Sequence, residues 1–246
     1  MIGIIGAMEE EVQELIADLA FAEKKTVASM DFYKGTLYGK DCVIVKSGVG
    51  KVNAALCTQI LADFYKPEAL INTGVAGSLD AQINIGDMVV SEDAVQHDMD
   101  ASAVGDPVGQ VPRMDVLAFP ADPVLVKKAV EANQKANPDI QTFTGRVASG
   151  DQFISGGEKK KQIQENFHAR CAEMEGAAIA HGAYLNKIPY VILRAISDKA
   201  DGSVQMDYPT FEKQAIVHCV RLLRELIPML SLIHITEPTR RTPISY

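Results

Sequence analysis

The sequence predicts one α/β domain with a central mixed, twisted β-sheet flanked by helices on both faces. Two observations predict it. Short apolar or β-branched runs alternate with segments whose apolar residues recur at helical spacing, a pattern typical of strands and helices that cover one another. The chain has 246 residues and is 47% hydrophobic, which suffices for one large core, and no low-complexity linker divides it.

The first half of the chain alternates expected strands and helices. A hairpin is expected around Gly39 and Lys40, because a turn pair separates two apolar runs there. In chain order we expect a strand at 2–5, a helix at 9–19, strands at 32–38 and 42–46, a helix at 52–65, and strands at 69–72 and 88–90.

The second half begins with a loop-rich stretch and then resumes the alternation. We expect loops at 97–123, a helix at 123–136, strands at 144–148 and before Glu173, helices from Glu158 and at 176–184, a strand at 190–195 and a helix from Tyr208. In such folds active sites form beyond the carboxyl ends of strands. That rule selects four junctions, at 6–11, 72–79, 149–157 and 195–201.

Composition and charge exclude several classes of function. The formal net charge of −8 argues against nucleic-acid binding. The one basic run worth noting, Lys159-Lys160-Lys161, is interpreted as a solvated helix face. The four cysteines lack CxxC spacing and indicate reduced thiols of a cytoplasmic protein, and the five histidines lack ligand spacing. We expect no metal, no membrane span and no signal peptide.

Residues 231–246 differ from the rest because they carry prolines and no amphipathic period. Pro228 indicates that the preceding helix ends nearby. We therefore expect one functional domain over residues 1–230, followed by a vector-derived or disordered tail.

Two glycine motifs do not predict a nucleotide cofactor. The run Gly48-Val49-Gly50-Lys51 resembles a phosphate-binding loop, but Val45 and Val52 occupy positions that require glycine and Ser or Thr. The run from Gly3 to Gly6 lacks dinucleotide-fingerprint spacing. No cofactor is expected.

Three acidic positions could carry chemistry, and each has a purely structural alternative. Glu9, Glu10 and Glu11 follow a strand, but carboxylates in a first helical turn are also favoured by the helix dipole. The two carboxylates of Glu173-Met174-Glu175 precede a helix of small residues, where close packing would hold them poorly solvated; they could simply be helix N-terminal charges. Asp198 ends a buried strand and is the best candidate for a proton donor, although it could instead cap a helix.

These positions also carry a resemblance to a known family. In order and spacing the sequence resembles the 5′-methylthioadenosine/S-adenosylhomocysteine nucleosidases of the nucleoside phosphorylase superfamily, from residue 1 to about 230. The matching segments are 3–12, 72–77, 149–154, 173–175 and 194–198. The resemblance implies a nucleoside phosphorylase-like fold and hydrolysis of a ribosyl–adenine bond, with methylthioadenosine, S-adenosylhomocysteine and 5′-deoxyadenosine as candidate substrates.

The resemblance also implies catalytic roles. Breaking the bond leaves positive charge on the ribose and negative charge on the base, so a catalyst should protonate adenine and supply water. By similarity, Asp198 donates a proton to adenine N7 with help from Ser197, and Glu11 polarises the attacking water from the opposite face. Two carboxylates with room for water between them also occur in inverting sugar hydrolases, an analogy only.

Substrate contacts follow from the same resemblance. Glu175 would accept hydrogen bonds from the ribose hydroxyls, with Met174 against the sugar. Phe153 would stack on adenine, the backbone of Phe153 or Ile154 would read its edge, and Arg194 would organise the carboxylates. The remaining expected site residues are Met8, Val49, Val75, Ala76, Gly77, Glu173 and Tyr208.

A neighbouring subunit closes the pocket in this family, and the equivalent positions are Val104 and Pro112. A homodimer is therefore expected. Two departures concern the pocket: Val75 stands where some relatives carry Ser, and Val104 stands where an aromatic residue is expected.

Two other functions compete with hydrolysis. A phosphorylase of the same superfamily would need converging cations to hold phosphate, whereas the 3–11 segment offers three glutamates. A nucleoside-binding protein without activity would not need both Glu11 and Asp198.

Overall fold

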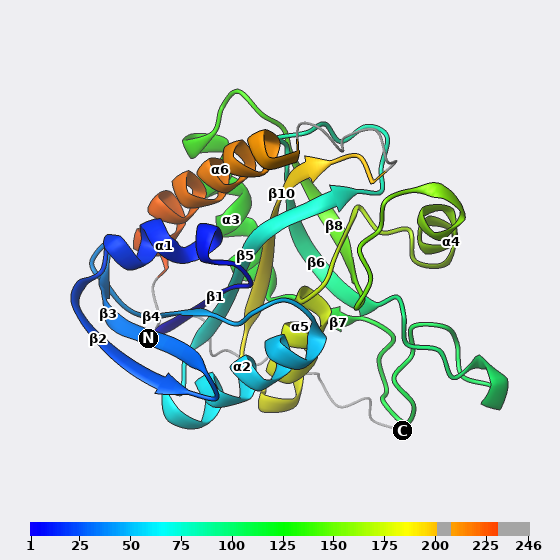
Figure 1. The fold of residues 1–246 in the computed structure, drawn as a ribbon, viewed down its shortest axis with the longest axis horizontal. Helices are drawn as coiled ribbons and strands as arrows, with labels where there is room; N and C mark the ends of the chain where they lie inside the picture. Colours follow the sequence, from blue (N-terminus) through cyan, green and yellow to red (C-terminus); the bar gives the residue numbers. More distant parts are fainter. Residues whose placement is uncertain (201–207, 231–246) are drawn as a thin grey trace, which may run out of the picture.

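The computed structural model describes residues 1–200 and 208–230 (Figure 1). Within these ranges ten strands form one sheet, in the order β10-β6-β8-β9-β5-β1-β4-β3-β2, with β7 paired to β6. The strands are β1 (Ile2–Gly6), β2 (Ala20–Val27), β3 (Met30–Leu37), β4 (Lys40–Lys46), β5 (Ala69–Ser78), β6 (Met88–Gln96), β7 (Phe119–Pro120), β8 (Thr142–Ser149), β9 (Cys171–Glu173) and β10 (Tyr190–Asp198).

Helices cover both faces of the sheet, as predicted (Figure 1). Ile4 packs in the core shared with α1, α3 and α6, whereas the next residue, Ile5, packs in the core shared with α2 and α5. This alternation follows from the two-residue period of a strand. The helices are α1 (Glu9–Ala17), α2 (Lys51–Phe64), α3 (Pro123–Ala136), α4 (Gly157–Phe167), α5 (Gly176–Asn186) and α6 (Tyr208–Met229), with a 3-10 helix at Ser102–Val104.

Part of the sheet closes into a ring. β10 pairs in parallel with β5 and antiparallel with β6, β6 pairs with β8, and β8 with β9. β9 then pairs with β5, which completes a ring of five strands. The alternation of elements predicts the mixed sheet but not this closure, because closure depends on pairings between distant strands.

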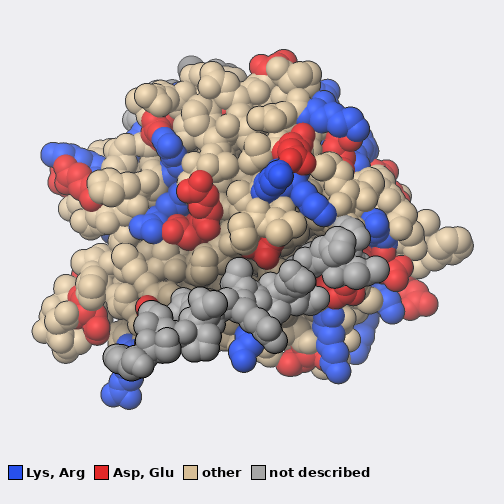
Figure 2. All heavy atoms as spheres, turned by 180° about the vertical axis from the view of Figure 1, so that it is seen from behind, with Lys and Arg blue, Asp and Glu red and all other residues tan. Residues whose placement is uncertain are grey.

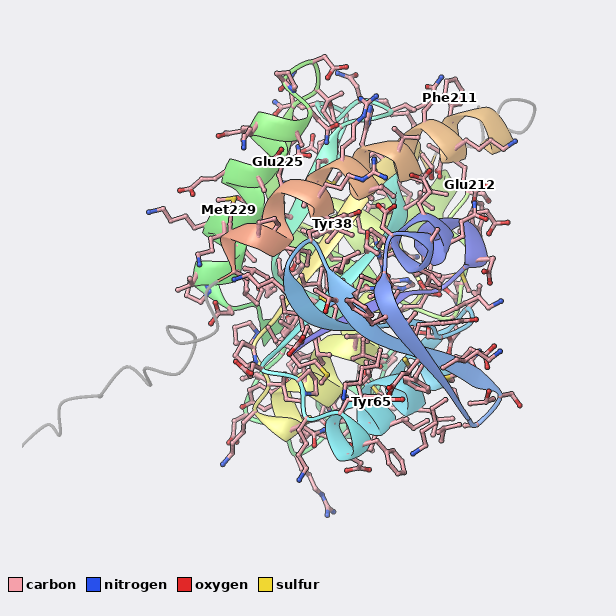
Figure 3. The ribbon with its side chains drawn as sticks, turned by 90° about the vertical axis from the view of Figure 1, so that its left-hand side faces the viewer. Tyr38, Tyr65, Phe211, Glu212, Glu225 and Met229 are labelled. Carbon is pink, nitrogen blue, oxygen red and sulfur yellow. The ribbon has the colours of Figure 1, made fainter. Side chains whose placement is uncertain are left out.

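The long helix α6 is fixed against α3 at its carboxyl-terminal half. Lys135 forms an ion pair with Glu225 at 2.6 Å, and Lys128 donates from Nζ to the carbonyl of Met229 at 2.9 Å. Figure 3 shows Glu225 and Met229 on the side of α6 that faces α3. The helix includes Pro228 in its last turn and ends one residue later, close to the predicted end.

The predicted elements occur, with differences at their ends. Three described elements were not predicted: the strand β2, and the two-residue strand β7 and the 3-10 helix within the expected loop at 97–123. β5, β6 and β10 continue through polar residues to Ser78, Gln96 and Asp198. The expected loop at 72–79 is therefore mostly strand, and the one at 195–201 begins within a strand. Ring closure gives these polar segments backbone partners. β2 was not predicted, because this edge strand is exposed along nearly all of its length and shows no apolar period.

The surface carries charges of both signs. On the face seen in Figure 2, lysines and arginines are interspersed with carboxylates. Among the described residues, no helix is long and apolar enough to cross a membrane. The expected tail, residues 231–246, lies outside the described part of the chain.

Candidate active site

A cavity of about 240 Å³ opens where several strands end. All four junctions selected from the sequence contribute to it, together with the segment after β9 and the turn after β4. Its lining consists of Ala7, Met8, Glu11, Val49, Val75, Ala76, Gly77, Gln152, Phe153, Ile154, Ala172, Glu173, Met174, Glu175, Ser197 and Asp198.

Asp198 is the last residue of β10, and both of its carboxylate oxygens are held. Oδ1 accepts a hydrogen bond from the Ala200 amide at 2.7 Å, and Oδ2 accepts one from the Ser197 hydroxyl at 3.0 Å. A side chain at Gly77 would meet Asp198 Oδ1 at 2.9 Å, so glycine at this position of β5 gives the carboxylate its room. The acid is fixed in orientation at the cavity wall.

Glu11 lies in the first turn of α1 and is buried at 6% exposure. Its Oε2 accepts from the amides of Ala7 and Met8 at 2.7 and 3.1 Å, and its Oε1 accepts from the Val75 amide at 3.2 Å. Burial raises the pKa of Glu11, although the charge of Arg194 and these amides oppose the shift. A carboxylate with a raised pKa is a better proton acceptor than an ordinary one.

Arg194 and Glu173 form a buried ion pair behind the cavity. Arg194 donates from Nη2 to Glu173 Oε2 and to Asn72 Oδ1, and Ser149 donates its hydroxyl to Glu173. Burial alone would raise the pKa of Glu173, but the charge of Arg194 and these hydrogen bonds lower it. Glu173 therefore remains ionised.

Glu175 occupies the position before α5, and its pKa shifts in the opposite direction from that of Glu173. Burial and the neighbouring charge of Glu173 raise its pKa to about 7. Arg194 lies 4.0 Å away, and the Gly50 amide donates to Glu175 Oε1 at 2.8 Å. This carboxylate changes its charge near neutral pH.

The loop after β8 and the turn after β4 form the outer walls of the cavity. Ile154 is buried and Phe153 presents 66% of its surface to solvent, while Val49, in the turn before α2, is 49% exposed. These apolar side chains suit the flat faces of a base and the carbon atoms of a sugar.

The structure brings most of the predicted site residues together around this cavity. They are Met8, Glu11, Val49, Val75, Ala76, Gly77, Phe153, Ile154, Glu173, Met174, Glu175, Ser197 and Asp198. Arg194 lies behind the lining, against Glu173. Tyr208 begins α6, but its side chain lies outside the described part of the structure.

Besides Arg194, two described residues of the prediction, Val104 and Pro112, do not line the cavity. Val104 is 81% exposed in the 3-10 helix, and Pro112 lies in the following loop. Three lining residues were not predicted: Ala7, Gln152 and Ala172. Ala7 and Gln152 lie inside both a selected junction and a matching segment, which was the available signal for them. Ala172 lies in no selected junction and directly precedes the matching segment 173–175.

Comparisons with known proteins agree with this arrangement. Residues 1–228 match the family model of the phosphorylase superfamily. The chain is 41% identical to a 5′-methylthioadenosine/S-adenosylhomocysteine nucleosidase of Staphylococcus aureus, over 94% of this chain and 100% of that protein.

Solved structures of this kind share the fold. The nucleosidase of Colwellia psychrerythraea, in complex with adenine, has a TM-score of 0.89 at 37% identity and covers 93% of this chain and 95% of its own. That of Neisseria meningitidis, in complex with methylthio-immucillin-A, has a TM-score of 0.89 at 33% identity and covers 93% and 99%. The chain therefore belongs to the phosphorylase superfamily and, within it, to the 5′-methylthioadenosine/S-adenosylhomocysteine nucleosidases.

Proposed function

We propose that this chain hydrolyses the N-glycosidic bond of 5′-methylthioadenosine and S-adenosylhomocysteine, releasing adenine, with Asp198 as general acid and Glu11 activating water. The observation that carries the proposal is one cavity lined by two held carboxylates from different elements, β10 and α1. Membership of the nucleosidase family supplies the substrate class.

Asp198 is suited to protonate the departing base. The reaction moves electrons from the C–N bond into adenine, and a proton delivered to N7 neutralises the charge that develops there. The hydroxyl of Ser197 and the amide of Ala200 restrict the carboxyl to one orientation. This orientation reduces the entropy that proton transfer would otherwise lose.

Glu11 is suited to polarise water on the other side of the bond. Its contact on β5 is Val75, and that of Asp198 is Gly77, two residues along one strand, or about 7 Å. Inverting sugar hydrolases also use two carboxylates set far enough apart to admit water, and this analogy supports an attack by water.

The remaining lining residues are suited to hold the nucleoside. Glu175 accepts from the ribose hydroxyls, Met174 lies against the sugar, and Phe153 stacks on adenine. The backbone of Phe153 or Ile154 reads the edge of the base. By the family resemblance, Met8, Val49 and Tyr208 are assigned to the ribose and the 5′ substituent. Val75, Ala76 and Gly77 are the other proposed substrate contacts.

Hydrolysis is favoured over phosphorolysis by the charge of the cavity. Lysine and arginine are absent from the described lining, and Arg194 behind it is already paired with Glu173. A phosphate ion entering here would meet carboxylates rather than converging cations.

The proposed assembly is a homodimer, in which Val104 and Pro112 of one copy close the pocket of the other. Exposed apolar residues on α2 and α5 support it: Val52, Leu56, Tyr184 and Leu185 are 38–70% exposed. We further propose that residues 1–230 are the functional unit and that it works in the cytoplasm, since its four cysteines are free and buried.

Adenine release from methylthioadenosine in phosphate-free buffer tests the function. The parent protein should release adenine, and Asp198→Asn and Glu11→Gln should each lower kcat about 10²- to 10⁴-fold. Glu9→Gln is the matched control, because Glu9 is an exposed carboxylate of the same helical turn that pairs with Lys46.

Three other results would contradict the proposed reaction or the proposed role of Asp198. Release only after phosphate is added would show a phosphorylase. Ligand binding without turnover in either buffer would show a binding protein. Full activity of Asp198→Asn would exclude Asp198 as the acid.

A further inference from the structure

A closed ring of hydrogen bonds behind the cavity joins three segments that are distant in sequence. The backbone N–H of Lys51 donates to Asp151 Oδ1 at 2.8 Å, and the N–H of Asp151 donates to Asp98 Oδ2 at 2.8 Å. Lys51 Nζ then donates to Asp98 Oδ1 at 2.6 Å and closes the ring. None of the three residues lines the cavity.

Two walls of the cavity begin at this ring. Gly50, directly before Lys51, donates its amide to Glu175, and Val49 lines the cavity. On the other side, Phe153 and Ile154 follow Asp151 by two and three residues. The ring therefore links the wall that carries Glu175 to the wall formed by the loop 151–154.

The rigid part of this link is the first turn of α2. Its N-cap residue is Gly50, which has no side chain to accept from the free N–H groups of the helix. The carboxylates of Glu175 and Asp151 accept from the Gly50 and Lys51 amides in its place. The positive end of the helix dipole favours both carboxylates, so the two walls share one anchor.

The ion pair within the ring is shielded from solvent. The side chains of Lys51 and Asp98 are 18% and 16% exposed. Lys51 Nζ also donates to Gln96 Oε1 at 3.1 Å, and Gln96 Nε2 lies 3.2 Å from His181 Nδ1 on α5. Removing one partner of such a pair leaves the other poorly solvated and without its partner, so the segments it joins should separate.

We propose that Lys51, Asp98 and Asp151 are positioning residues that set the spacing between the loop 151–154 and the Glu175 wall. They pre-order the cavity for the nucleoside and take no part in bond cleavage. The inference rests on the proposed function for the identity of the ligand, and it goes beyond it by assigning a role to residues outside the cavity.

Steady-state kinetics and adenine binding provide the first test. Because the ring contributes equally before and during bond cleavage, Asp98→Ala should raise KM for methylthioadenosine about ten- to a hundredfold and leave kcat within about threefold. The dissociation constant for adenine should rise with KM. Lys51→Arg keeps the charge and should restore KM to near the parent value, whereas Lys51→Met should behave as Asp98→Ala.

The matched control is Asp93→Asn. Asp93 pairs with Arg146 at similar exposure, 25% and 28%, and neither residue lines the cavity. It should lower the melting temperature without changing KM. An unchanged KM in both Asp98→Ala and Lys51→Met, or an equal rise of KM in Asp93→Asn, would overturn the proposal.

Amide hydrogen exchange of the ligand-free protein tests this inference independently of the proposed function, because the measurement needs no substrate. In Asp98→Ala or, if that variant fails to fold, Asp98→Asn, the amides of Gly50, Lys51 and Asp151 should exchange faster, while those of α3 stay unchanged. Unchanged exchange rates at these amides would refute the proposed positioning role, even if the variant is inactive. Faster exchange supports it whatever the substrate proves to be.

Discussion

At the scale of single residues, the site is organised around Arg194. This guanidinium is buried beside three carboxylates, and although burial alone would lower its pKa, the charges of Glu173, Glu11 and Glu175 raise it. One cation cannot neutralise three anions in a medium of low polarity. The pKa directions follow: Glu173 takes the ion pair and keeps its charge, whereas Glu11 and Glu175 bind protons more readily.

The raised pKa of Glu175 predicts how stability depends on pH. The pKa of the Glu175 carboxyl is about 7 in the folded protein and about 4.5 in the unfolded chain. The contribution of Glu175 to the free energy of unfolding is therefore fully present below pH 4.5 and is lost as the pH rises to about 7. The slope is at most about 1.4 kcal/mol per pH unit. Glu175→Gln should remove it.

Urea unfolding of the parent and of Glu175→Gln at pH 5, 6, 7 and 8 measures this difference. His97 and His181, whose pKa values are lowered by burial, act in the opposite sense, so only the difference between the two proteins isolates Glu175. Glu23→Gln, at an exposed position of β2, is the control. Parallel curves for the parent and Glu175→Gln would contradict the prediction.

At the scale of elements, β5 separates the two proposed catalytic carboxylates. A side chain at Gly74 would lie 2.5 Å from Glu11 Oε1 and 2.7 Å from Arg194 Nη1. At Gly77 it would meet Asp198. Glycine is needed at both positions because charged side chains lie too close to the strand to leave room for a Cβ atom.

Gly74→Ala should therefore displace Glu11 and Arg194. We expect a loss of about 1–3 kcal/mol in the free energy of unfolding from overpacking. A displacement of about 1 Å at a reacting group should lower kcat about 10²-fold. Chemical unfolding and adenine release measure the two effects.

A control variant with a similar loss of stability, at a position away from the cavity, distinguishes a direct effect on activity from an effect of destabilisation. Asp122 caps α3 by accepting from the amides of Val124 and Leu125, and Asp122→Ala should cost about 1 kcal/mol. Its kcat should stay at the parent value. If Gly74→Ala retains full kcat, the close approach at Gly74 has no catalytic consequence.

Elements with a strong local signal were predictable, and those determined by distant partners were not. The spacing of apolar residues and Pro123 predicted the observed ends of α3. Gly39 predicted the hairpin of β3 and β4. β2 has no apolar face, so only its pairing with β3 makes it a strand. The polar ends of β5 and β10 are strands because each supplies the backbone partners of the other.

At the scale of the whole molecule, the ring of strands assembles the site from segments that are far apart in the chain. The junction rule and the resemblance predicted which segments meet, and the carboxylates of Glu11, Glu175 and Asp198 were named from the sequence. The ring of Lys51, Asp98 and Asp151 was not predictable. Each of its hydrogen bonds joins two of three distant segments, the start of α2, the segment after β6 and the loop after β8, and no spacing in the sequence encodes their relative positions.

The proposed homodimer gives the last prediction, which concerns the face formed by α2 and α5. The two helices pack closely: a side chain at Gly182 would meet Thr58 Cγ2 at 2.8 Å, and Asn186 donates from Nδ2 to Gln59 Oε1 at 2.9 Å. Apolar side chains remain exposed on this face, among them Leu56 at 49% and Leu185 at 64%. Several exposed apolar side chains on two packed helices favour contact with another protein surface.

Leu56→Glu should convert a dimer into a monomer, because a charge on each copy would be buried without a partner across the interface. Sedimentation velocity at several concentrations measures the change. KM for methylthioadenosine should rise in parallel, since Val49, two residues before α2, is both exposed and part of the cavity lining. Val217→Glu places the same charge on α6, on the opposite side of the sheet, and should leave both properties unchanged. A parent protein that sediments as a monomer at every concentration would exclude the homodimer, and the pocket would then be complete within one chain.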